Sequence, residues 1–105
     1  MRKQRKALLK NLCSSLVMHE RVSTTETKAK AVRPYVERVI AQALNNTLAG
    51  KRYAYRFLSR QAAKKLLRER LTRFESRRSG WTRIAKLPGH RKDGARKAII
   101  EFVDK

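Results

Sequence analysis

The hydrophobic pattern changes period three times along the chain, and these changes limit the fold more than any other feature. Apolar residues recur at helical spacing over about 4–18, from Thr25 or Glu26 onward, and over about 50–58 and 60–74. Short apolar and β-branched runs, RVSTT near the start and WTRIAKL and KAIIEFV near the end, predict strands. Since so few strands need helices on a face, the order predicts an α+β fold: one helix, a short strand, three helices and a C-terminal β-hairpin. If the early strand joins the hairpin, the first and last quarters of the chain meet in one small sheet.

The second helical stretch contains Pro34 and leaves two alternatives open. A helix that starts near Thr25 would lose its backbone bond to the Lys30 carbonyl at Pro34 and would kink there. Alternatively, a new helix begins at Pro34 and the residues before it are extended. The run NNTLAG then predicts the helix end, with Asn and Gly as stop signals.

Three hydroxyl side chains lie where the early strand meets this helix. Ser23 has capping-box spacing to Glu26, and Thr25 is the rival N-cap, which would leave Ser23 and Thr24 in the strand. Lys28 and Lys30 follow in the first helical turns, where positive charge opposes the helix dipole. That placement makes sense if a phosphate lies nearby.

The charge of the chain points to a polyanionic partner. Lys and Arg number 28 against 8 Asp and Glu, a formal net charge of +20 that repels itself in a compact protein. Nucleic acid is the commonest compensating polyanion, and a hydrophobic content of 41% predicts a folded body beneath the charge. The basic residues form three zones: five basic and no acidic residues over 1–10, seven and two over 64–78, six and one over 83–97. This spread predicts phosphate contacts on several sides, without the sequence reading that one recognition helix provides.

The residues that could support other chemistry are few. A single cysteine excludes an internal disulfide and a multi-cysteine zinc site, and Cys13 is expected to be a small buried hydrophobe. His19 and His90 lack the neighbours of a metal site and are expected to contact phosphate or lie in the core; a metal-free nuclease using them with a lysine is the alternative. Trp81 can stack on a base or pack over the sheet edge, and packing is favoured.

The remaining features suggest a soluble intracellular protein. The carboxylates Glu20, Glu37, Glu69 and Glu75 have basic neighbours in sequence and are expected to form solvated ion pairs. No apolar run approaches the roughly 18 residues of a membrane span. No small-residue cleavage site follows the basic and apolar N-terminal segment, which is therefore interpreted as an amphipathic helix.

Three segments carry a resemblance to a known family. NLCSSLVMHERVSTTETKAKAVRPYVERVI, followed by GWTRIAKL and IIEFVD, resembles the bacterial-type large-subunit ribosomal protein family seventeen. The most specific matches are Ser15-Leu16-Val17, His19-Glu20, Thr24-Thr25, Lys28-Ala29-Lys30 and Arg33, then Gly80, Thr82-Arg83-Ile84 with Lys86, and Ile100-Glu101 with Val103-Asp104.

The resemblance implies an α+β fold with helices packed on a small mixed sheet, and residues 1–105 forming a single ribosomal-protein domain. It implies a structural role in the large ribosomal subunit, bound to 23S-type ribosomal RNA near the nascent-chain exit region and beside neighbouring ribosomal proteins. No enzymatic activity, cofactor, metal, membrane or small-molecule substrate is implied. The resemblance also favours Thr25 as the N-cap. The location is then the cytoplasmic ribosome of a bacterium, with an organellar ribosome as the alternative.

The sequence departs from the family pattern at two places. Family members usually begin with a longer basic tail that threads into RNA, whereas Met1 here lies close to the predicted first helix, so those contacts are missing or the tail lies outside this sequence. The loop GHRKDGARKA replaces the common GDxAPxA type and carries more charge.

Basic side chains of the first helix, the strand–helix joint and the C-terminal signature are predicted to contact RNA. A free DNA- or RNA-binding regulator is the main rival function. The predicted RNA-binding residues are Arg2, Lys3, Arg5, Lys6, Lys10, His19, Lys28, Lys30, Arg33, Arg77, Arg78, Arg83, Lys86, Arg91 and Lys92.

Overall fold

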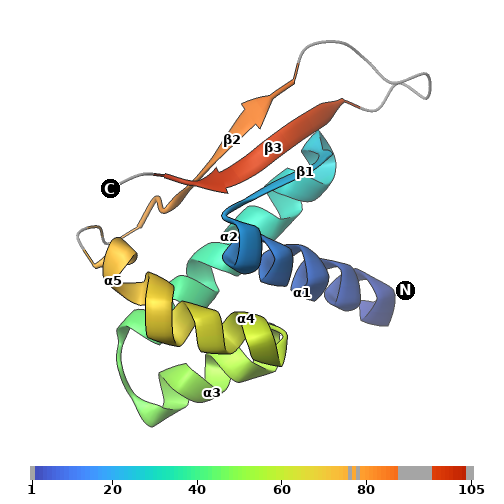
Figure 1. Cartoon of the computed structure of the whole chain (residues 1–105). Coiled ribbons are helices and arrows are strands. Elements are labelled where there is room, and N and C mark those ends of the chain that lie inside the picture. Colours follow the sequence, from blue (N-terminus) through green and yellow to red (C-terminus); the bar gives the residue numbers. More distant parts are fainter. Residues whose placement is uncertain (1, 76, 78, 88–95, 104–105) are drawn as a thin grey trace.

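The computed structural model describes residues 2–75, 77, 79–87 and 96–103, with side chains from residue 5 onward. Figure 1 shows a small sheet along one side of a group of helices. The predicted order of elements is confirmed. The elements are α1 (Arg2–His19), β1 (Arg21–Thr25), α2 (Glu26–Leu44), α3 (Leu48–Phe57), α4 (Arg60–Lys65), the π-helical segment η1 (Leu66–Arg70), α5 (Leu71–Phe74), β2 (Thr82–Lys86) and β3 (Lys97–Phe102).

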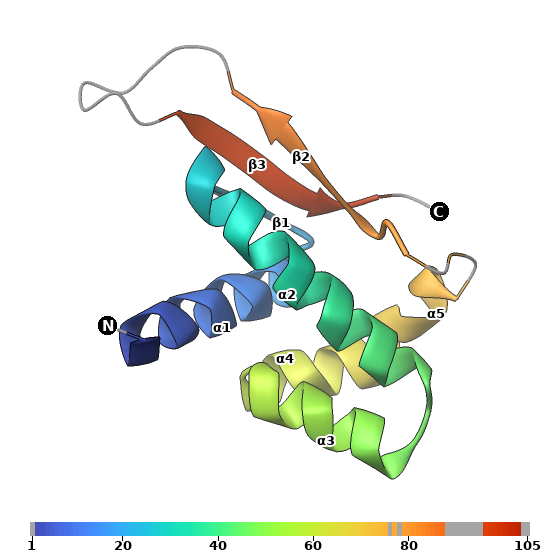
Figure 2. The ribbon, with the colours of Figure 1, turned by 180° about the vertical axis from the view of Figure 1, so that it is seen from behind.

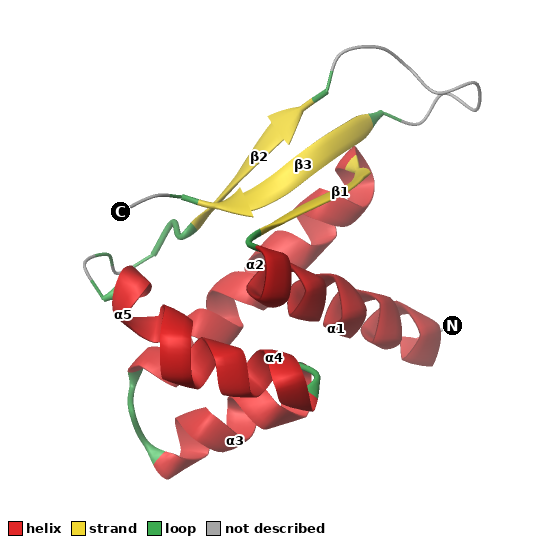
Figure 3. Cartoon of the chain, in the orientation of Figure 1, coloured by secondary structure: helices red, strands yellow, loops and turns green. Residues whose placement is uncertain are grey.

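The sheet joins the two ends of the chain and confirms the α+β class. Its strand order is β1-β3-β2 (Figure 3). In the register of the strands, Val22 of β1 and Ile84 of β2 both lie opposite Ile100 of β3. The sheet is antiparallel throughout rather than mixed, because β2 and β3 form the predicted hairpin and β1 pairs antiparallel with the other edge of β3.

Helix α2 covers the inner face of this sheet, as the view from behind shows (Figure 2). Along β3 every second residue is buried, so Ala98, Ile100 and Phe102 face the helices. Val32, Val36 and other apolar residues of α2 recur at helical spacing and are fully buried. Burying each aliphatic side chain of this size contributes roughly 1.5–3 kcal/mol, so this layer is the main hydrophobic core.

Helix α2 runs without a break through Pro34, so the alternative of a new helix starting there is wrong. Pro34 and Lys30 are both exposed. The Lys30 carbonyl that loses its helical donor therefore lies on the solvent side, where water can replace the missing N–H.

The turn between α2 and α3 uses the asparagines and glycine differently from the prediction. Asn46 supplies the left-handed residue after the helix, with φ of 52°. Thr47 then caps α3, its Oγ1 accepting from the Gly50 N–H at 3.0 Å. Gly50 lies inside α3 rather than ending α2. Glycine is needed there because a Cβ at this position would lie 2.2 Å from the Gln42 carbonyl oxygen of α2. Its role is close helix–helix approach.

The predicted helix 60–74 forms in three joined parts. Ser59 caps α4, accepting from the Ala62 N–H at 3.2 Å, and its own N–H donates to Ser14 Oγ of α1 at 2.8 Å. The helix then widens into η1 and continues as α5. Leu66 and Phe74 are both buried, so the apolar stripe is directed at the core despite the π-helical turn.

Two predictions about single residues are confirmed by the core. Cys13 is fully buried, and desolvation raises the pKa of its thiol well above the usual range. Trp81 is buried beside β2, and its Nε1 donates to the Phe74 carbonyl at 2.9 Å. Trp81 is therefore a packing residue, and the base-stacking alternative is wrong for this position. None of the described helices combines the length and hydropathy needed to cross a membrane.

Candidate nucleic-acid interface

Helix α1 separates an apolar face from a basic face. Cys13, Leu16 and Val17 are fully or almost fully buried, whereas Arg5 and Lys6 are exposed and Lys10 is half-buried. Lys6 and Lys10, one helical turn apart, line the same cavity between α1, α2 and α3. Arg2 and Lys3 belong to the first turn of α1, and their side chains lie outside the described part of the structure.

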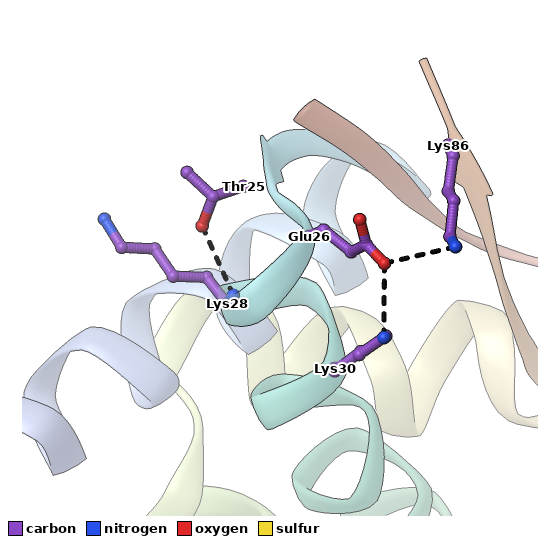
Figure 4. Close-up of polar contacts among 5 residues, drawn as sticks. All are labelled: Thr25, Glu26, Lys28, Lys30 and Lys86. Atoms are coloured by element: carbon purple, nitrogen blue, oxygen red, sulfur yellow. Dashed lines mark hydrogen bonds and ion pairs between the residues drawn. The ribbon is translucent and has the colours of Figure 1, made fainter. Parts of the chain in front are cut away.

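The strand–helix joint is capped by Thr25. Its Oγ1 accepts from the Lys28 N–H at 3.3 Å, and Ser23 and Thr24 belong to β1 (Figure 4). The prediction that favoured Thr25 is confirmed, and the capping-box alternative from Ser23 is wrong. Lys28 is exposed.

Glu26 holds two of the predicted RNA-binding lysines. Lys30 Nζ lies 3.2 Å and Lys86 Nζ 3.3 Å from Glu26 Oε1, one lysine from α2 and one from β2 (Figure 4). The hydrogen bond from Lys30, with a further one from Lys86, lowers the pKa of the Glu26 carboxyl. The carboxylate therefore offsets the unfavourable placement of Lys30 in the first turns of the helix. Both ammonium side chains are more than half exposed, at 65% and 61%, and so can still reach a phosphate.

Three of the predicted RNA-binding arginines also have partners within the chain. Arg83 Nε lies 3.0 Å from Glu101 Oε1, an exposed pair across β2 and β3. Arg33 Nη2 donates to the Thr82 carbonyl at 3.4 Å, and Arg77 Nη1 to the Gly80 carbonyl at 3.5 Å. Arg33, Arg77 and Arg83 are exposed residues, so their guanidinium groups remain available to a phosphate.

The remaining predicted RNA-binding residues take no part in the contacts described above. His19 is exposed at the last turn of α1, where a positive charge would favour the helix dipole. Arg78, His90, Arg91 and Lys92 lie outside the described residues. The structure thus brings Lys30 and Lys86 together, whereas Lys6 and Lys10 lie on a separate surface.

Glu37 has a role that the sequence did not indicate. Its Oε1 accepts from the Gly80 N–H at 3.0 Å and the Trp81 N–H at 3.4 Å. Its Oε2 accepts from the Thr82 N–H at 3.0 Å and from Thr82 Oγ1 at 2.8 Å. The expectation of a solvated ion pair is wrong here, because this carboxylate fixes the segment before β2 to α2.

Glu20 forms ion pairs, but with partners distant in sequence. It follows α1 with φ of 70°, and its carboxylate pairs with Arg70, at 2.9 Å, and with Arg73. Arg70 also donates to the Met18 carbonyl at 3.2 Å. The end of α1 is therefore attached to η1 and α5 through arginines counted among the basic zone 64–78.

Helix α3 supplies basic residues that the sequence analysis did not select. Lys51, Arg52 and Arg56 are exposed, and α3 contains no acidic residue. The Arg56 guanidinium lies 5.4 Å from the centre of the Phe57 ring, a cation–π geometry. The signal was present in KRYAYRF, which contains three basic and three aromatic residues within seven positions.

Five basic residues of α1, α2 and α3 lie around two adjoining hollows. None of these five forms an ion pair with another described residue. Two hollows that share Arg56 connect them, one lined by α1, α2 and α3 and one along α3. We call this the α1–α3 basic surface: Lys6, Lys10, Arg38, Arg52 and Arg56. Among the described residues there is no group of three or more His, Cys, Asp or Glu side chains arranged to hold a metal ion.

Comparison with known proteins identifies the family. The model of the family "Ribosomal protein L17" matches residues 8–103. A protein of Hydrogenobaculum sp. named "Large ribosomal subunit protein bL17" is 45% identical over 103 residues, which cover 96% of this chain and 87% of that protein. Proteins of the same name from Gemmatimonas aurantiaca and Shouchella clausii are 47% and 42% identical, covering 95% of this chain in both cases and 86% and 91% of those proteins. The chain therefore belongs to the ribosomal protein L17 family.

Proposed function

We propose that this protein is a structural constituent of the large ribosomal subunit that binds 23S-type ribosomal RNA through phosphate contacts on several surfaces. The observation that carries the proposal is the α1–α3 basic surface, where five cations from three helices have no ion-pair partner among the described residues. The relatives named as large-subunit proteins support the assembly, and the resemblance described above supports a position near the nascent-chain exit region.

The carboxylates of the chain reinforce this interpretation. Glu20, Glu26 and Glu101 pair with basic side chains, and Glu37 binds backbone N–H groups, so each has a role within the fold. Eight carboxylates cannot balance 28 Lys and Arg side chains, so most of the positive charge is left for an external polyanion. Lys and Arg neutralise RNA phosphates and release condensed counterions without reading base sequence.

A second RNA contact is proposed around Glu26, where Lys30 and Lys86 meet, while the Lys28 side chain of the same helix end extends away from them (Figure 4). The α1–α3 basic surface and this cluster involve different side chains of α2, Arg38 in one and Lys30 in the other. Two such contacts would join separate RNA segments, which is a structural role rather than an enzymatic one. Residues 1–105 would act as one domain in a bacterial ribosome, beside neighbouring ribosomal proteins.

RNA binding measured against salt tests the phosphate mechanism. We expect the logarithm of the association constant to fall linearly with the logarithm of salt concentration, with a slope of magnitude about 4 to 9 if roughly 6 to 10 phosphates are neutralised. The variant Lys10→Gln/Arg38→Gln should reduce that magnitude, whereas Glu69→Gln, an exposed change on η1, should not. Affinity independent of salt would exclude the mechanism.

Sedimentation of a cell lysate tests the assembly. The protein should travel with the large ribosomal subunit, and recovery as a small free species would favour the rival regulator. Purified protein should also leave RNA intact. RNA cleavage that disappears in His19→Ala would instead favour the nuclease.

A further inference from the structure

The hollow between α1, α2 and α3 has an apolar wall and a cationic rim. Its volume is about 450 Å³, within the range of about 300–1,000 Å³ that small-ligand sites occupy. Leu9, Tyr35 and Phe57 are half-buried and supply the apolar wall. Lys6, Lys10, Arg38 and Arg56 also line the hollow, and none of its described lining residues is acidic.

The aromatic wall is fixed by contacts within the chain. Tyr35 Oη donates to the Phe57 carbonyl at 2.7 Å, and the two rings meet edge to face with centres 5.8 Å apart. Tyr53 packs on Phe57 with ring centres 4.4 Å apart. Since these contacts exist before any ligand arrives, a planar group entering the hollow meets a wall that is already ordered.

The charge of the hollow is suited to an anion. Four cations converge from three helices, and none of them forms an ion pair with another described residue. Burial raises the pKa of Tyr35 to about 12, so its hydroxyl stays neutral near pH 7 and adds no negative charge beside the cations. Arg56 lies 5.4 Å from the Phe57 ring centre, where its planar guanidinium can both stack on a base and bind a phosphate.

We propose that this hollow binds one unstacked nucleotide of single-stranded RNA, with the base against Leu9, Tyr35 and Phe57 and the phosphate held by the four cations at the rim. The inference rests on the proposed RNA-binding function and gives it a specific subsite. A hollow lined by both an aromatic wall and cations fits a nucleotide better than a duplex backbone, which offers phosphates but no free base face. None of the described residues that line the hollow carries a carboxylate or a side-chain amide, so the site should tolerate any base.

Two RNA oligonucleotides of equal length and charge test this inference with the full chain. One carries uracil at every position, and the other is the same ribose-phosphate chain without bases. The uracil oligonucleotide should bind on the order of tenfold more tightly, because stacking and apolar contact depend on the base. Phe57→Leu should abolish most of this difference while leaving the affinity for the abasic chain nearly unchanged.

Charge variants separate the phosphate contacts from the base contacts. Arg56→Gln should weaken binding of both oligonucleotides, and that of the uracil chain more, since Arg56 lies against the aromatic wall. Lys51→Gln removes an equal charge from an exposed position of α3 that does not line the hollow, and is the matched control. It should weaken both oligonucleotides equally. Circular dichroism of each variant verifies that the fold is retained.

Crosslinking then locates the base. RNA containing 4-thiouridine, irradiated in complex with the protein, should crosslink to peptides that contain Tyr35 or Phe57. Equal affinity for the two oligonucleotides, with steep salt dependence and crosslinks only elsewhere, would overturn the subsite and leave the hollow to a segment of a neighbouring protein. Failure of both oligonucleotides to bind at low salt would overturn the proposed RNA-binding function as well.

Discussion

Glu37 and Glu26 belong to the same helix but act on different parts of the fold. Glu26 binds two exposed lysine side chains, Lys30 and Lys86. Glu37 instead accepts three backbone N–H groups and one hydroxyl from residues 80–82. An exposed ion pair contributes little to stability, whereas a carboxylate that satisfies partly buried backbone donors contributes more.

Replacing Glu37 by Gln is therefore expected to lower the free energy of unfolding by about 2–3 kcal/mol, because an amide NH₂ would face backbone donors and leave them unpaired. Urea unfolding followed by circular dichroism measures this. Glu75→Gln, an exposed change near the end of α5, is the control and should stay within about 0.5 kcal/mol of the parent. Equal losses in both variants would contradict the role assigned to Glu37.

Thr25 and Ser23 allow a second test at this scale. Thr25→Ala removes the oxygen that accepts from the Lys28 N–H at 3.3 Å, and should cost about 0.5–1 kcal/mol. Ser23→Ala changes an exposed strand residue that caps nothing and should cost less. Thermal unfolding of the two single variants under identical conditions gives the comparison, and a larger loss for Ser23→Ala would return the cap to that residue.

At the scale of elements, the sequence was sufficient to predict features that depend on residues close together in the chain. The apolar period along α2 predicted its buried face, and Thr25 was among the predicted caps. Interactions between distant residues left no local signal. Glu37 binds a segment more than 40 positions away, and the close approach at Gly50 depends on α2 lying beside α3.

The same distinction between local and long-range interactions applies to the candidate site. The basic faces of α1 and of the joint at Lys28 were visible from charge spacing. Arg52 and Arg56 also lie in a short segment rich in basic and aromatic residues, KRYAYRF, but were not among the predicted RNA-binding residues. The hollow itself could not be predicted, because its wall combines Leu9, Tyr35 and Phe57 from three separate helices.

Gly50 provides the prediction that belongs to the α2–α3 pair. In an exposed helix, Gly→Ala usually stabilises by about 1 kcal/mol. Here the new Cβ would lie 2.2 Å from the Gln42 carbonyl oxygen, a backbone atom that can move only if the two helices separate. Gly50→Ala should therefore destabilise by about 1–3 kcal/mol, measured by urea unfolding. The neighbouring exposed position supplies the control, since Ala49→Gly should cost only about 1 kcal/mol. A stabilised Gly50→Ala variant would mean that the helices can move apart freely.

At the scale of the whole molecule, one excess of charge has two opposite consequences. The formal net charge of +20 destabilises the free protein through self-repulsion and provides its attraction to RNA. The α1–α3 basic surface concentrates part of that charge at positions with no internal partner among the described residues. Salt screens both effects, so stability and RNA affinity should respond to it in opposite directions.

We therefore expect the urea midpoint of the free protein to rise between about 0.05 and 0.5 M sodium chloride, while its RNA affinity falls steeply over the same range. A variant with Lys6, Lys10, Arg52 and Arg56 all replaced by Gln has a formal charge of 20 − 4 = +16, and both responses should be smaller in it. At low salt this variant should be at least as stable as the parent, although it binds RNA more weakly, because the removed cations repel one another and form no ion pair with another described residue. If this variant were instead less stable than the parent at low salt, the α1–α3 basic surface would stabilise the fold itself, and its charge would not serve only to bind a polyanion.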